Sequence, residues 1–76
     1  MTPEEVQKSI EEGRAALVQY AEMVVNGTRT RTEVFDLARV EADALMCLLD
    51  DAADLEAVRI HELLDRYETL MAALVN

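Results

Sequence analysis

The stretch that decides the fold is EVFDLARVEADALMCLLD, residues 33–50. On a helical wheel four of its six charged side chains fall in one narrow sector: Asp36, Arg39, Asp43 and Asp50. Apolar side chains occupy most of the remaining circumference, an arc of about 240°. A helix on the surface of a globule needs an apolar stripe of only about 100°. The stretch therefore predicts the central helix of a bundle, covered by neighbouring helices on two sides.

A first helix is predicted on the N-terminal side of this stretch. Thr2 can cap it, and Pro3 suits its first position. Apolar or small residues then recur at spacings of three and four: Val6, Ile10, Gly13, Leu17, Tyr20 and Val24. Gly13 on this stripe indicates either close approach of a neighbouring helix or a glycine without a packing role. Asn26-Gly27 predicts the end of the helix, because glycine readily adopts the left-handed conformation found there.

A third helix is predicted on the C-terminal side, where one stripe gathers Ala53, Ala57, Ile60, Leu64, Tyr67, Met71 and Leu74. The segment between Asp50 and Asp54 contains neither Gly nor Pro, so a turn and a bent continuous helix both fit. We predict a turn in which Asp51 caps the third helix, because acidic residues in a first turn complement the helix dipole.

These signals predict one all-α domain over residues 1–76, an antiparallel three-helix bundle with helices near 3–26, 31–50 and 52–75. Thr30 and Glu33 form a capping box at the start of the second helix. The connection before it is short, which makes the first two helices antiparallel neighbours.

Chain length and the broad apolar arc together predict self-association. A single core in so small a domain rarely supplies more than about 3–5 kcal/mol. Cys47 is the only cysteine, so no internal disulfide can form, and one histidine beside it argues against a structural zinc site. Leu37, Val40 and Met46 cannot all face the same interior. We therefore expect a homodimer formed through the central helix.

The charge balance points to the kind of partner. Sixteen acidic residues against seven basic ones leave a formal charge of −9. Phosphate backbones and anionic lipids repel such a surface, so nucleic acid and membranes are disfavoured as partners. A basic protein surface would be attracted, although solubility alone also explains an acidic composition. No apolar run reaches the ~18 residues of a membrane span and no signal peptide is evident, so we expect a cytoplasmic protein.

Motifs that carry chemistry are missing from the sequence. Ser9 and His61 lie on separate predicted helices without a nucleophile motif around either. With two glycines in the chain there is no Gly-rich phosphate-binding loop. Helical di-metal sites use Glu-x-x-His, and Val58 stands where that glutamate would be relative to His61. The sequence predicts a protein that is not an enzyme and needs no cofactor or metal.

The leading functional hypothesis is a protein that binds, and by binding can inhibit, another macromolecule. Its candidate contact residues on the outer face of the third helix are Asp54, Glu62, Asp65 and Glu68, with Asp43 and Asp50 at the border. Glu41 lies within the apolar arc, where it either receives a basic group from a partner or bends out to the helix edge. Phage-encoded inhibitors and bacteriocin immunity proteins share this composition, but no residue pattern links the chain to them.

Two alternative functions stay open at this point. A structural or assembly subunit would use the wide apolar surface for oligomerisation. A nucleic-acid-binding helical dimer would instead use Arg29 and Arg31, which form the local excess of positive charge in the linker before the second helix.

Overall fold

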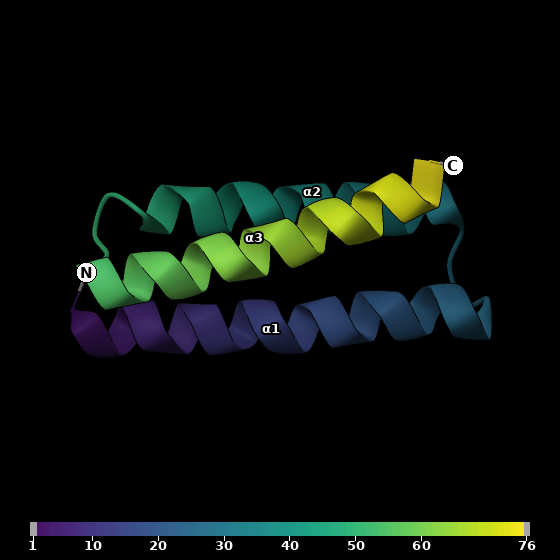
Figure 1. The fold of residues 1–76 in the computed structure, drawn as a ribbon. Coiled ribbons are helices and arrows are strands. Elements are labelled where there is room, and N and C mark those ends of the chain that lie inside the picture. Colours follow the sequence, from purple (N-terminus) through teal and green to yellow (C-terminus); the bar gives the residue numbers. More distant parts are fainter. Residues whose placement is uncertain (1, 76) are drawn as a thin grey trace.

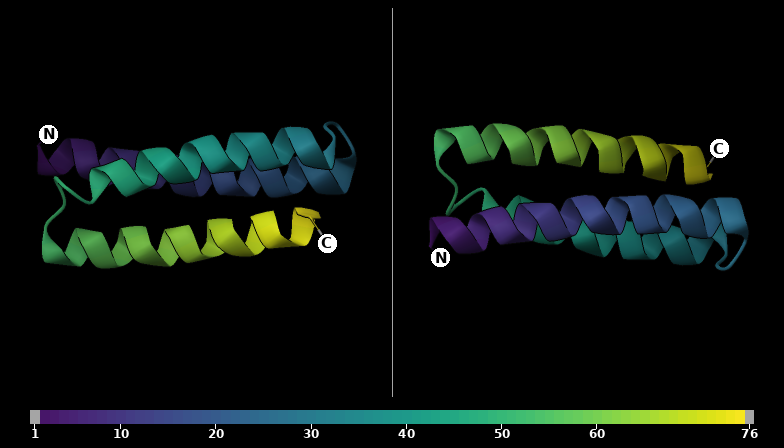
Figure 2. Two further views of the ribbon diagram at one scale, coloured as in Figure 1. Left: turned by 90° about the horizontal axis from the view of Figure 1, so that it is seen from above. Right: turned by 90° about the horizontal axis from the view of Figure 1, so that it is seen from below.

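Three helices account for most of the residues, 2–75, that the computed structural model describes. They are α1 (Pro3–Asn26), α2 (Arg31–Leu48) and α3 (Asp54–Val75). The helices α1 and α3 run in the same direction and α2 runs against both (Figure 1). In the views from above and below, α1 and α2 overlap and α3 lies to one side of them (Figure 2). The predicted all-α three-helix bundle is confirmed.

Both ends of α1 follow the sequence signals. The Thr2 hydroxyl accepts a hydrogen bond from the Glu5 backbone N–H at 3.3 Å, which satisfies one of the donors left open at a helix start. Gly27 has a φ of 68°, and its N–H bonds back to the carbonyls of the last helical turn. A residue with a Cβ would be strained in that left-handed conformation, so Gly27 ends the helix.

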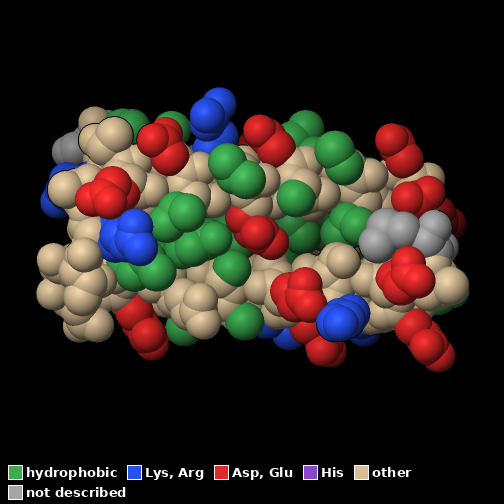
Figure 3. All heavy atoms as spheres, turned by 180° about the vertical axis from the view of Figure 1, so that it is seen from behind, with side chains coloured by type: hydrophobic (Ala, Val, Ile, Leu, Met, Phe, Trp, Pro, Cys, Tyr) green, Lys and Arg blue, Asp and Glu red, His purple; other side chains and the backbone are tan. Residues whose placement is uncertain are grey.

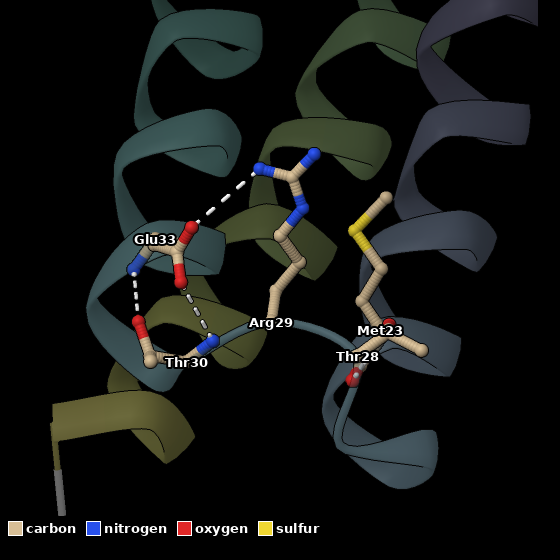
Figure 4. Close-up of polar contacts among 5 residues, drawn as sticks. All are labelled: Met23, Thr28, Arg29, Thr30 and Glu33. Atoms are coloured by element: carbon tan, nitrogen blue, oxygen red, sulfur yellow. Dashed lines mark hydrogen bonds and ion pairs between the residues drawn. The ribbon is translucent and has the colours of Figure 1, made fainter.

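The start of α2 is a complete capping box. The Thr30 hydroxyl accepts from the Glu33 N–H, and a Glu33 carboxylate oxygen accepts from the Thr30 N–H, each at 3.1 Å (Figure 4). The hydrogen bonds from Thr30 hold the pKa of the Glu33 carboxyl below its usual value, and the charge of Arg29 adds to the effect. Protonation of Glu33 at acidic pH therefore weakens this cap.

The connection between α2 and α3 corrects the sequence prediction. The helix α2 ends at Leu48 and α3 begins at Asp54, close to the predicted start near residue 52, but Asp51 is not its cap. The cap position is Ala53, whose backbone N–H donates to the Glu56 carboxylate at 3.0 Å. This contact is the glutamate half of a capping box, while Ala53 has no side-chain oxygen to accept the hydrogen bond that forms the other half. The predicted turn, as opposed to one bent helix, is confirmed.

The centre of the bundle is closed around Gly13. A Cβ placed on this residue would lie 3.0 Å from a Leu45 methyl group and 3.2 Å from a Leu63 methyl group. The Tyr67 hydroxyl, fully buried, donates a hydrogen bond to the Gly13 carbonyl. Its ring meets that of Tyr20 edge to face, with centroids 6.5 Å apart. Gly13 therefore lets α2 and α3 approach α1 closely, the first of the two roles considered for it.

The central helix is only partly covered. Its buried side chains face α1 and α3: Val34, Ala38, Ala42, Leu45 and Leu48. Leu37 is half-buried, while Val40 and Met46 remain 63% and 56% exposed. The apolar arc of the second helix is thus wider than one bundle can cover, as the sequence predicted.

Candidate partner-binding grooves

The candidate acidic residues of α3 are all exposed, but they lie along different grooves. Asp65 and Glu68 line the groove between α2 and α3. Glu62 lines the groove between α1 and α3, and Asp54 is the first residue of α3, at the end of the bundle. The candidate residues therefore do not form a single acidic face. Glu62 projects from one side of α3, toward α1, and Glu68 projects from the other side, toward α2.

The groove between α2 and α3 has an apolar floor and a mostly acidic edge. We call it the acidic groove; its volume is about 300 Å³. Its apolar lining is Ala42, Met46, Leu49, Leu64 and Met71, and its polar lining is Arg39, Asp43, His61, Asp65 and Glu68. Asp43 is part of this lining, whereas Asp50 is not. The sequence did not predict that Met46 and Met71 line a groove. For Met46 a signal was present, because Arg39, Ala42, Asp43 and Met46 have the i, i+3, i+4, i+7 spacing of one helix face.

The groove between α1 and α3 has the opposite charge. It measures about 250 Å³ and is lined by Arg14, Arg59, Glu62, Leu63 and Arg66; we call it the arginine groove. Three of the seven basic residues of the chain meet here. The Arg59 guanidinium donates a hydrogen bond to the Gln7 side-chain oxygen at 3.2 Å. The sequence did not predict this cluster, since Arg14 joins Arg59 and Arg66 only through tertiary packing.

Glu41 lies in a hollow between α1 and α2, on the face opposite α3. The hollow, about 180 Å³, is lined by Ser9, Glu12, Glu41, Ala44, Leu45 and Leu48. Glu41 is half-buried there. Hydrophobic side chains gather along the middle of the face seen in Figure 3. Burial raises the pKa of the Tyr67 hydroxyl, and the negative charge of Glu41 raises it further; the same two causes raise the pKa of Tyr20.

The Arg29–Arg31 linker presents less positive charge than its sequence indicates. A guanidinium nitrogen of Arg29 lies 3.5 Å from a Glu33 carboxylate oxygen, in an exposed ion pair (Figure 4). Arg31 is the exposed first residue of α2. One of the two charges is therefore already paired, and the positive charge of a cation at a helix start opposes the helix dipole.

Neither a metal site nor a membrane span is found in residues 2–75. No three side chains among their His, Cys, Asp and Glu residues are grouped closely enough to hold a metal ion. None of the three helices has the length and apolar character needed to cross a bilayer.

Comparison of the chain with protein-family models, with curated proteins and with solved structures finds no significant match.

Proposed function

We propose that this chain is a non-enzymatic interaction protein whose acidic groove receives an amphipathic helix with basic residues beside its apolar stripe. The observation that carries the proposal is the combination, in one groove, of an apolar floor with carboxylates from both walls. Asp43 belongs to α2, while Asp65 and Glu68 belong to α3. A basic helix would pair its flanking charges with both walls at once.

The apolar floor supports a helical occupant in particular. Met46 is 56% exposed, and Met71 and Leu64 are half-buried, so apolar area remains to be covered. A helix laid in a groove buries side chains at positions i, i+3, i+4 and i+7 against such a floor. Methionine side chains adapt their shape to different partners, which suits a groove of this kind. Covering a basic surface of the partner would block its other contacts, and inhibition is the expected consequence.

A titration with designed peptides tests this function. The probe is a helical peptide with a leucine stripe flanked by lysines; a peptide with the same stripe flanked by glutamates is the control. We expect the lysine peptide to shift the amide NMR signals of the acidic groove. Binding should weaken as ionic strength rises, because the screening length falls from about 10 Å at 0.1 M salt to about 3 Å at 1 M.

Charge reversal then locates the contact. Asp65→Lys with Glu68→Lys should weaken binding of the lysine peptide at least tenfold, since both pairings become repulsive. The matched control is Glu22→Lys with Asp36→Lys, which changes the net charge equally at exposed positions outside the three grooves. Equal binding by the two double variants would contradict the proposal.

Self-assembly is a second candidate, favoured by the apolar face of α1 and α2. Leu37 and Val40 share this side of α2 with Ala44 by helical spacing, and hydrophobic side chains continue across it (Figure 3). Light scattering at micromolar concentration should then give twice the chain mass, and Val40→Asp should restore the monomer. A wild-type monomer that stays folded on dilution would remove this candidate.

A further inference from the structure

We infer that the arginine groove is a binding site for the phosphate group of a small molecule, independent of the proposed function of the acidic groove. The first observation is the distribution of charge. A chain with a formal charge of −9 brings Arg14, Arg59 and Arg66 to one groove. Within residues 2–75 the structure contains one ion pair, between Arg29 and Glu33, so no carboxylate is in salt-bridge contact with these three guanidinium groups.

The second observation is that the bundle core sets the positions of these arginines. Arg14 follows Gly13, and Arg66 precedes Tyr67. The hydrogen bond from the Tyr67 hydroxyl to the Gly13 carbonyl therefore ties together the two helical turns that carry them. Leu63, which lines the groove, also packs against Gly13. Arg59 is oriented separately by its hydrogen bond to Gln7. A site built on packed helices holds its side chains more accurately than one built on a loop.

The net charge of the groove selects the ligand class. Three arginines and Glu62 together carry +2. A phosphate monoester carries about −1.5 to −2 at pH 7, whereas a single carboxylate carries −1. Guanidinium groups also bind phosphate oxygens through two parallel hydrogen bonds, which a lysine cannot do.

The size of the groove and the charge of the whole chain limit the rest of the ligand. A volume of about 250 Å³ is below the ~300–1,000 Å³ of pockets that enclose drug-sized molecules. Inorganic phosphate or a small phosphate monoester fits this space. A long polyanion such as RNA would extend over the acidic surfaces beside the groove and be repelled by them.

The test is an NMR titration of the full chain with inorganic phosphate, with phenyl phosphate and with a short single-stranded oligonucleotide, at matched ionic strength in sodium chloride. Inorganic phosphate and phenyl phosphate distinguish the free ion from an esterified source, and binding of either supports the inference. We expect signal changes around Arg14, Arg59 and Arg66. Binding of the oligonucleotide alone, or no saturable change with the other two, would overturn it.

Variants on one helix separate a local site from the general field of the protein. Arg14→Gln should weaken phosphate binding about tenfold, the size of one charge-assisted hydrogen bond. Lys8→Gln removes the same charge from another side of α1, away from the groove, and should leave binding unchanged. Arg14→Lys, which keeps the charge but not the planar fork, should bind with intermediate affinity. Equal weakening by Arg14→Gln and Lys8→Gln would overturn the inference.

Discussion

The two grooves beside α3 differ in charge although one helix contributes to both. Asp65 and Glu68 line the acidic groove, while Arg59 and Arg66 line the arginine groove. Asp65 and Arg66 are neighbours in the chain, yet about 100° of helical rotation directs them to different sides. The rotation of α3 about its own axis thus decides which charges each groove presents.

Packing at the bundle centre sets that rotation. Tyr67 is fully buried and bonded to Gly13, and Leu63 packs on the same glycine. Leu63 also lines the arginine groove, and Leu64 lines the acidic one. The same packing therefore closes the bundle centre and leaves the two grooves open. Substitutions in the bundle centre should lower stability far more than substitutions in the grooves.

The largest difference in stability is expected between variants of two adjacent residues of α2, one in the bundle centre and one in the acidic groove. Leu45→Ala should lower the free energy of unfolding by about 3 kcal/mol, because Leu45 is buried against Gly13 and its removal leaves a cavity. Met46→Ala should change it by no more than about 0.5 kcal/mol, because Met46 is exposed in the acidic groove. Urea unfolding followed by far-UV circular dichroism measures both. Similar values for the two variants would mean that the centre is not closed as described.

A smaller effect is expected at the tyrosine that joins α3 to α1. Tyr67→Phe should cost about 1 kcal/mol through loss of its hydrogen bond to Gly13. Tyr20→Phe is the control, because Tyr20 is half-buried and its hydroxyl makes no hydrogen bond within the described residues. Thermal unfolding at pH 7 compares the two. An equal loss in both would show that the hydroxyl of Tyr67 has no special role.

The same tyrosine makes a prediction about alkaline pH. The pKa of Tyr67 is raised above its ordinary value of 10.0 in the folded state, first by burial and then by the charge of Glu41. Its contribution to stability is therefore fully present below about pH 10 and is lost as pH rises toward the folded-state pKa. Tyr67→Phe should show a smaller loss of stability above pH 10 than the wild type.

The smallest effect is expected on phosphate affinity, from a substitution that changes the charge of one groove only. Glu62→Gln removes the carboxylate from the arginine groove and leaves the lining of the acidic groove unchanged. Phosphate affinity should rise about two- to threefold, as expected for removal of one exposed repulsive charge. Binding of the lysine peptide should stay the same. A comparable change in peptide binding would mean that both ligands respond to the overall charge of the protein, and that the two grooves are not separate sites.

Sequence alone predicted the helices and most of the core, since their causes are local. Thr2, Gly27 and the Thr30–Glu33 box act within one turn of the helix ends they define. The apolar stripes follow from helical periodicity, and they include the fully buried Ile60 and Tyr67. Asp51 was the wrong capping residue for α3, because the helix begins at Asp54 and the cap position falls on Ala53, whose N–H donates to the Glu56 carboxylate.

Only the tertiary structure decided how the charged residues are grouped. Arg14 lies more than forty positions before Arg59 in the chain, and no periodicity within either helix relates them. Asp43 meets Asp65 across a groove that exists only once α2 packs on α3. Spacing within a helix determines which of its side chains share a face, because the backbone geometry is regular. Which face of one helix meets which face of another depends on packing at the centre, here on the space that Gly13 leaves for Leu45 and Leu63.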